Sequence, residues 1–333
     1  LKIIYQNKQF YFKKKLPHDL MENVIIQLLI CLIGLFGLFY GGEKLVTGSV
    51  NTASFFKVKP QFIAITIIAL GTSFPELVVS VNAVVDESPG IAWGNVLGSN
   101  ISNILLVLGL ASLMHPLYLK GGKSNANIFW LFFSSVLFFS ISVGTKSISF
   151  FYGIVLILLL IIFLIYMVYI SKNNGNTTDR NKINEKLSLW NTILFIFFGI
   201  IILIISAEAV VNSSVKIASL FNVPETFIGL TIIAIGTSLP EISASIVAVK
   251  KGYSEIAVGN VIGSNIFNTL GIIGTCAVFS RGSEFLVPES FLIFDVPFML
   301  ISTLLFCLLI YINVVSGKKI GVIFITTYFV YIF

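Results

Sequence analysis

The sequence predicts an all-α membrane protein of about ten transmembrane helices in two inverted five-helix repeats. Three observations lead to this fold class. Of the 333 residues, 56% are hydrophobic and only 11% are charged, whereas an average soluble domain carries roughly 25% charged residues. Long apolar stretches alternate with short polar segments along the whole chain. Finally, two motifs occur twice, and both pairs are separated by the same 165 positions (241 − 76 and 268 − 103).

The apolar stretches are the candidate spans, and most approach the roughly 20 residues that a helix needs to cross hydrocarbon. The ten stretches are 24–42, 60–85, 91–114, 126–143, 149–170, 190–211, 224–249, 255–279, 290–315 and 319–333. The last stretch is short for a complete span.

These spans divide the chain into a first repeat at 24–170 and a second repeat at 190–333. The linker between them, 171–189, is rich in Asn, Lys and Thr and is too short to fold as a domain of its own. Residues 1–23 form a basic N-terminal arm. Either the arm precedes a true start at Met21 and is absent from the mature protein, or it lies on a membrane surface.

Lysine and arginine placement predicts the orientation, because cytoplasmic loops are enriched in these residues. If the N-terminus lies outside, the inner loops carry most of the basic residues, including those of the linker, and the outer loops carry only Lys146, Lys216 and Arg281. The lysines of the basic arm oppose this orientation without reversing the bias. We therefore expect an integral plasma-membrane protein, in a prokaryotic inner membrane, with a cytoplasmic linker. Five spans separate the motif copies, and an odd number inverts the second repeat relative to the first.

Composition also disfavours several other classes of protein. The net charge of +6 is concentrated in alternate short loops, which indicates topology rather than a nucleic-acid surface. The three cysteines, Cys31, Cys276 and Cys307, lie in apolar runs without metal-ligand spacing. The two histidines, His18 and His115, lie outside the repeated motifs, so no serine–histidine pair suggests an enzyme. We expect no cofactor.

The first repeated motif, Gly-Thr-Ser-x-Pro-Glu, occupies 71–76 and 236–241. Pro75 and Pro240 are expected to break their helices, because proline lacks an amide hydrogen and clashes with the preceding turn. Carbonyl groups freed in this way are tolerated at membrane depth only where they meet a partner or line a cavity. The motif also supplies hydroxyl oxygens and one carboxylate in each half: Thr72, Ser73, Glu76, Thr237, Ser238 and Glu241.

The second motif, Gly-Asn-x-x-Gly-Ser-Asn-Ile-x-Asn, occupies 94–103 and 259–268. It adds neutral oxygens from Ser99, Asn103, Ser264 and Asn268, and each serine lies one helical turn before its asparagine. Its glycines, four residues apart, are expected to let helices approach closely. All the donors of both motifs are oxygens, which hard cations such as Ca²⁺ and Na⁺ prefer. A proline kink repaired by hydroxyls is the structural alternative for one such motif, but two matched copies with glutamates favour an ion site.

At these residues the chain resembles the calcium/cation antiporter superfamily, in particular the prokaryotic members of its sodium/calcium exchanger branch. The resemblance covers residues 24–333 and implies an ion site on spans two, three, seven and eight. It implies central carboxylates at Glu76 and Glu241, and coordinating oxygens at Thr72, Ser73, Thr237, Ser238, Ser99 and Ser264. It further implies sodium ligands from the carbonyls of Ala69 and Ala234 and an amide ligand at Asn103. The chain departs from the family at Asn268, where an aspartate is common, so the stoichiometry is open.

The expected function is therefore antiport of Na⁺ and Ca²⁺ by alternating access, with the two ions and the lipid bilayer as partners and no nucleic acid. A cation/proton antiporter is the alternative within transport, and a passive cation channel is the alternative from another class. The sequence does not decide the preferred divalent ion, or whether the chain is monomeric or dimeric.

Three further acidic residues lie in or near the spans. Glu43 and Glu208 are also 165 positions apart, and solvation at the membrane interface is the favoured interpretation over a role in gating. Asp295 lies near the outer end of the ninth stretch, where we expect it to cap the helix N-terminus.

Overall fold

A computed structural model describes residues 18–118, 125–173, 187–221, 223, 234–280 and 285–333. Helices dominate both halves of this chain. The first half contains α2 (His18–Phe55), α3 (Pro60–Ile63), η1 (Ala64–Ile68), α4 (Ala69–Thr72), α5 (Phe74–Val85), α6 (Pro89–Ser102), η2 (Asn103–Val107), α7 (Leu108–Met114), α8 (Asn125–Thr145) and α9 (Phe150–Asn173), where η marks π-helical segments. The second half contains α10 (Leu189–Leu220), α12 (Ala234–Gly236), α13 (Leu239–Lys250), α14 (Ser254–Ile266), η5 (Phe267–Ile272), α15 (Ile273–Phe279), η6 (Phe291–Asp295), α16 (Val296–Tyr311) and α17 (Lys318–Ile332).

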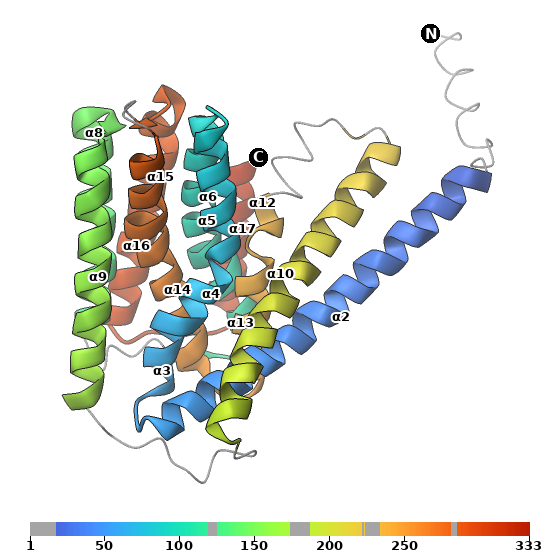
Figure 1. Cartoon of the computed structure of the whole chain (residues 1–333), viewed down its shortest axis with the longest axis horizontal. Coiled ribbons are helices and arrows are strands. Elements are labelled where there is room, and N and C mark those ends of the chain that lie inside the picture. Colours follow the sequence, from blue (N-terminus) through green and yellow to red (C-terminus); the bar gives the residue numbers. More distant parts are fainter. Residues whose placement is uncertain (1–17, 119–124, 174–186, 222, 224–233, 281–284) are drawn as a thin grey trace.

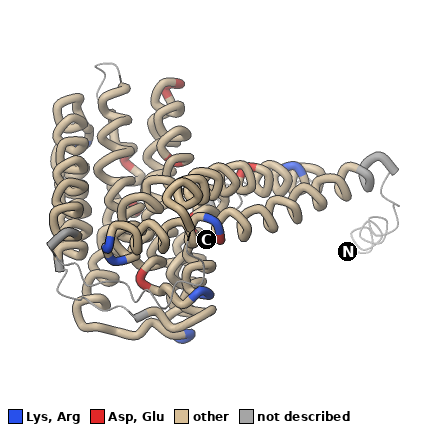
Figure 2. Tube along the Cα trace, turned by 60° about the horizontal axis from the view of Figure 1, so that its bottom comes forward, with Lys and Arg blue, Asp and Glu red and all other residues tan. Residues whose placement is uncertain are grey.

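The long helices α2 and α10 form a pair that crosses the rest of the molecule obliquely and projects beyond it at one end (Figure 1). Their contact is close, since a Cβ atom added at Gly199 would lie 2.7 Å from the backbone nitrogen of Leu45. The other helices form an upright bundle, in which α6 and α14 are the most enclosed and carry the second motif of each half. Charged residues are sparse along the helices (Figure 2).

Two short antiparallel sheets join the halves of the chain. Strand β1 (Leu117–Tyr118) pairs with β4 (Val315–Ser316), and β2 (Ser147–Ile148) pairs with β3 (Phe285–Leu286). Each sheet therefore joins a loop of the first half to a loop of the second half.

Seven helical segments within the described residues are long and apolar enough to cross a membrane, or eight if the bent pair 60–72 and 74–85 is one span. Every apolar stretch is mostly helical where it is described, with breaks at Ser73 and at 237–238, and the ninth stretch ends in a turn and in β4. The predicted bounds of the first and sixth stretches were wrong: α2 continues to Phe55 and α10 to Leu220, because the polar residues that end each apolar run are compatible with a helix. The count of ten spans and the inversion of the repeats stay predictions. Residues 1–17, most of the linker and 224–233 of the seventh stretch lie outside the described residues.

Candidate cation site

The first motif forms a break between two helices in each half. In the first half α4 ends at Thr72, α5 begins at Phe74, and the segment 60–72 is bent by 42° relative to 74–85. In the second half α12 ends at Gly236 and α13 begins at Leu239. Each proline lies in the first turn of the second helix of its pair, where its fixed φ and missing donor are favourable. Glu76 and Glu241 therefore also lie in a first helical turn, where the helix dipole favours negative charge.

The two glutamates are enclosed in the protein, and hydrogen bonds connect the halves around them. Glu76 is 1% exposed and Glu241 is 0% exposed. Ser73 Oγ of the first half donates to Glu241 Oε1 of the second half at 3.1 Å. Thr72 Oγ1 lies 3.3 Å from Asn260 Oδ1, again across the halves. The two motif copies, 165 positions apart, thus meet in one buried polar cluster.

The second motif brings Ser99, Asn103, Ser264 and Asn268 into the same buried region, and each of them is at most 2% exposed. The helices change from α to π geometry at the asparagines: η2 begins at Asn103, and η5 begins one residue before Asn268. Such π segments leave backbone groups out of the regular α ladder and occur frequently at functional sites. The α-helical face that each serine was predicted to share with its asparagine therefore ends at the asparagine, where the helix changes from α to π geometry.

Many buried polar atoms of this cluster have no hydrogen-bond partner among the described residues. They are Glu76 Oε2, Glu241 Oε2, Ser99 Oγ, Ser238 Oγ, Ser264 Oγ, Asn103 Oδ1 and both polar side-chain atoms of Asn268. Leaving buried polar groups unpaired costs free energy, so this many in one place indicates that a ligand completes the cluster. The described residues contain no group of three or more His, Cys, Asp or Glu side chains placed so that they could hold a metal ion together. Two carboxylates and several neutral oxygens suit a hard cation.

Three predicted ligand positions, Ala69, Ala234 and Thr237, are not among these unpartnered atoms. The carbonyl oxygen of Ala69 accepts from the backbone nitrogen of Ser73 at 3.0 Å and from Thr72 Oγ1 at 3.4 Å, so its helix already uses it. Ala234 begins α12, and its side chain is outside the described residues. Thr237 lies between α12 and α13 and lines a cavity together with Ser99.

A layer of amides behind these residues was missed by the sequence reasoning. Asn95 donates to the backbone carbonyl of Glu76 at 3.1 Å and to Ser80 Oγ at 2.9 Å. Its counterpart Asn260 lies 3.5 Å from Ser245 Oγ, which is 165 positions after Ser80. Asn95 and Asn260 occupy the same position of the second motif, so the 165-residue spacing could have singled them out. These amides fix the helix that carries each glutamate.

The glycines of the second motif behave differently in the two halves. A Cβ atom added at Gly263 would lie 2.2 Å from the carbonyl oxygen of Ile65 and 2.6 Å from Ala69 Cβ, so α14 approaches η1 and α4 closely, as predicted. A Cβ atom added at the equivalent Gly98 would meet nothing within 4 Å among the described residues. The prediction of close approach is not tested for Gly98, which lines a cavity, because most of the equivalent segment of the second half, 230–234, lies outside the described residues.

Glu43 forms an ion pair with Lys251, with 3.0 Å between Oε1 and Nζ, and Lys251 Nζ also donates to Thr47 Oγ1 at 2.9 Å. Both charged side chains are partly exposed, at 56% and 33%, and exposed ion pairs contribute about 0–1 kcal/mol. Replacing Lys251 with methionine is expected to lower the free energy of unfolding by less than about 1 kcal/mol. Thermal unfolding of the purified protein checks this, and a fall in Tm of more than roughly 5 °C would contradict it.

These features define a class of protein: a helical membrane protein with a buried, oxygen-rich polar cluster between two matched helix pairs. A comparison with family models places the chain within that class. The model of the sodium/calcium exchanger family matches residues 26–169 and 191–333, which is most of both halves. The chain belongs to the sodium/calcium exchanger family, and it is a transporter rather than an enzyme.

Individual relatives agree with this assignment. The sodium/calcium exchanger MaX1 of Methanosarcina acetivorans is 31% identical over 327 residues, which cover 87% of this chain and 92% of the relative. The inner membrane protein YrbG of Escherichia coli is 32% identical over 259 residues, covering 76% and 80%. A solved structure of the sodium-calcium exchanger NCX_Mj soaked with Na⁺ and Sr²⁺ matches with a TM-score of 0.79 and 30% identity, over 92% of this chain and 97% of that one.

Proposed function

We propose that this protein exchanges Na⁺ for Ca²⁺ across the membrane by alternating access at the buried cluster. The observation that carries the proposal is the set of unpartnered oxygens around two enclosed carboxylates. Family membership and the exchangers among its relatives support the choice of ions. The proposed ligands are the predicted set: Glu76, Glu241, Thr72, Thr237, Ser73, Ser238, Ser99, Ser264, Asn103, Asn268, and the carbonyls of Ala69 and Ala234.

The charge of the site explains why exchange is coupled. Two carboxylates neutralise one Ca²⁺ or two Na⁺, so either load leaves little net charge at membrane depth. An empty pair of ionised carboxylates is costly to enclose in a low-dielectric interior. Loaded states therefore cross more readily than the empty state, and the two ions compete for the same oxygens. Asn268, which is neutral, keeps the carboxylate count at two.

A cavity on one side of the cluster supports alternating access. Around Gly263 the helix α14 is packed tightly against η1 and α4, and a cavity lined by Gly98, Ser99 and Thr237 lies at the other motif copy. Inverted repeats can exchange these two arrangements, so that the side that is open becomes closed. With the N-terminus outside, the open region lies toward the outer face, and the site described here corresponds to access from outside.

Uptake of radioactive Ca²⁺ into Na⁺-loaded proteoliposomes tests the function. Dilution into Na⁺-free buffer is expected to drive Ca²⁺ uptake, and dilution into buffer with equal Na⁺ is expected to abolish it. Vesicles with a pH gradient but no Na⁺ gradient serve as the comparison. Uptake driven by the pH gradient alone would favour cation/proton antiport, and uptake that needs neither gradient would favour a channel.

A further inference from the structure

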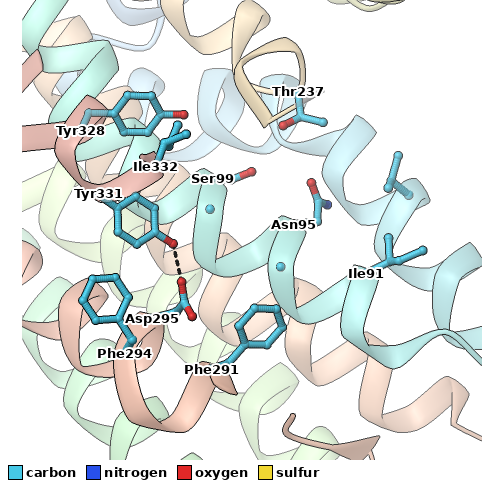
Figure 3. A pocket seen from close by; sticks show the side chains of 13 residues that line it. Ile91, Asn95, Ser99, Thr237, Phe291, Phe294, Asp295, Tyr328, Tyr331 and Ile332 are labelled. Atoms are coloured by element: carbon cyan, nitrogen blue, oxygen red, sulfur yellow. Dashed lines mark hydrogen bonds between the residues drawn. The ribbon is translucent and has the colours of Figure 1, made fainter. Parts of the chain in front are cut away.

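A cavity of about 400 Å³ lies beside the proposed cation site. It is bounded by α5, α6, η6 and α17, and Ser99 and Thr237 of the proposed ligand set lie in its wall (Figure 3). Ser99 is 2% exposed, and its Oγ has no hydrogen-bond partner. Gly98 also lines the cavity. The cavity therefore reaches two of the proposed ion ligands from one side of the protein.

Of the described residues that line the cavity, Asp295 alone carries a charge. We predicted that it caps a helix, and this was wrong: η6 continues into α16, and the Asp295 side chain forms no cap hydrogen bond. Its Oδ1 instead accepts a hydrogen bond of 2.6 Å from the hydroxyl of Tyr331 on α17 (Figure 3). None of the ion pairs among the described residues includes Asp295.

A carboxylate without a basic partner inside a membrane protein is costly and is a functional candidate by default. The Tyr331 hydrogen bond fixes the orientation of the carboxylate without neutralising its charge. The surrounding wall is mostly aromatic and aliphatic, with Phe291 and Phe294 beside Asp295. Low-dielectric walls focus the field of a charge and raise the local concentration of ions of opposite sign.

We propose that the cavity is an aqueous vestibule in which Asp295, oriented by Tyr331, forms a second, transient cation site. A hydrated Ca²⁺ or Na⁺ ion would be held there before it reaches Ser99 and Thr237. The role in transport rests on the proposed function, but the attraction of cations into the cavity does not. Asp295 is thus a recruitment residue and not one of the buried ligands.

Cysteine labelling tests the vestibule without measuring transport. Gly98→Cys is made in a Cys31→Ser background, because Cys276 and Cys307 are buried. Two impermeant methanethiosulfonates are compared, one with a trimethylammonium group and one with a sulfonate group; the cysteine thiolate forms a mixed disulfide and methanesulfinate leaves. The cationic reagent is expected to react faster, and Asp295→Asn is expected to lower the cation-to-anion rate ratio by roughly tenfold. Tyr331→Phe keeps the charge and is expected to change the ratio less.

Two further variants control this experiment. Val79→Cys lies in the same cavity and serves as a second reporter if the first variant fails to fold, and Phe221→Cys at the end of α10 lies outside it. The ratio at Phe221→Cys is expected to be independent of Asp295→Asn. Cavity cysteines that react only after denaturation, or a ratio that Asp295→Asn leaves unchanged, would overturn the proposal.

Transport measurements then connect the vestibule to exchange. In Asp295→Asn the external Ca²⁺ concentration for half-maximal flux is expected to rise roughly threefold to tenfold, with the maximal rate within about twofold. An unchanged half-maximal concentration would overturn the recruitment role. A wild-type protein without Na⁺-driven flux would instead contradict the proposed function, and the labelling ratio would still report on Asp295.

Discussion

Glu241→Gln is expected to abolish Na⁺-driven Ca²⁺ uptake. The substitution removes one of two buried charges while the side chain keeps its size and its contact with Ser73. Removing one partner of a buried pair of opposite charges, here the carboxylate that faces the bound cation, costs about 3–5 kcal/mol. This corresponds to a fall of more than about a hundredfold in the affinity for the cation at 1.4 kcal/mol per tenfold. Glu76→Gln is expected to have the same effect, because its carboxylate is equally enclosed and also has an unpartnered oxygen.

Glu208→Gln is the matched control for these variants. Glu208 is an exposed glutamate on α10, so its replacement is expected to change uptake by about twofold or less. Equilibrium binding of radioactive Ca²⁺ to the purified proteins separates ligand loss from failure to change conformation. Glu241→Gln protein that folds, binds Ca²⁺ as tightly as wild type and transports it would exclude the paired-carboxylate site.

The helices and the residues of the buried polar cluster could be predicted from the sequence because both depend on local patterns. Apolar runs mark the membrane helices, and the repeated motif places proline and glutamate in the first turn of a helix wherever it occurs. The matched spacing of Glu76 and Glu241 predicts that the two glutamates share one site. The structure brings the two motif copies together through the bond from Ser73 to Glu241.

Features that depend on distant partners could not be predicted in the same way. Asp295 was interpreted from its position near a helix end, but its partner Tyr331 lies 36 positions later on another helix. Glu43 ends an apolar run without ending α2, because charged residues are good helix formers and can reach water from a membrane surface. The π-helical turns at Asn103 and Asn268 have no local signal in the residues themselves.

The contacts of the second-motif glycines also depend on distant helices, and the close contact at Gly263 leads to a second large expected effect. Gly263→Ala would place a methyl group 2.2 Å from the carbonyl oxygen of Ile65, so α14 must move away from η1. Overpacking of this kind costs about 1–3 kcal/mol, and we expect Tm to fall by roughly 5 °C in thermal unfolding of the purified protein. Exchange is expected to fall with it, since α14 also carries Ser264.

Gly98→Ala is the same chemical change at the equivalent position, and it is expected to have the opposite sign. Its added methyl group meets nothing within 4 Å among the described residues, and alanine is favoured over glycine in a helix interior by roughly 0.5–1 kcal/mol. Tm is therefore expected to stay level or rise slightly. Equal destabilisation by both variants would mean that the two halves are packed alike around the site. Opposite shifts would instead locate the closed side at α14 and the open side at α6, in agreement with the proposed alternating access.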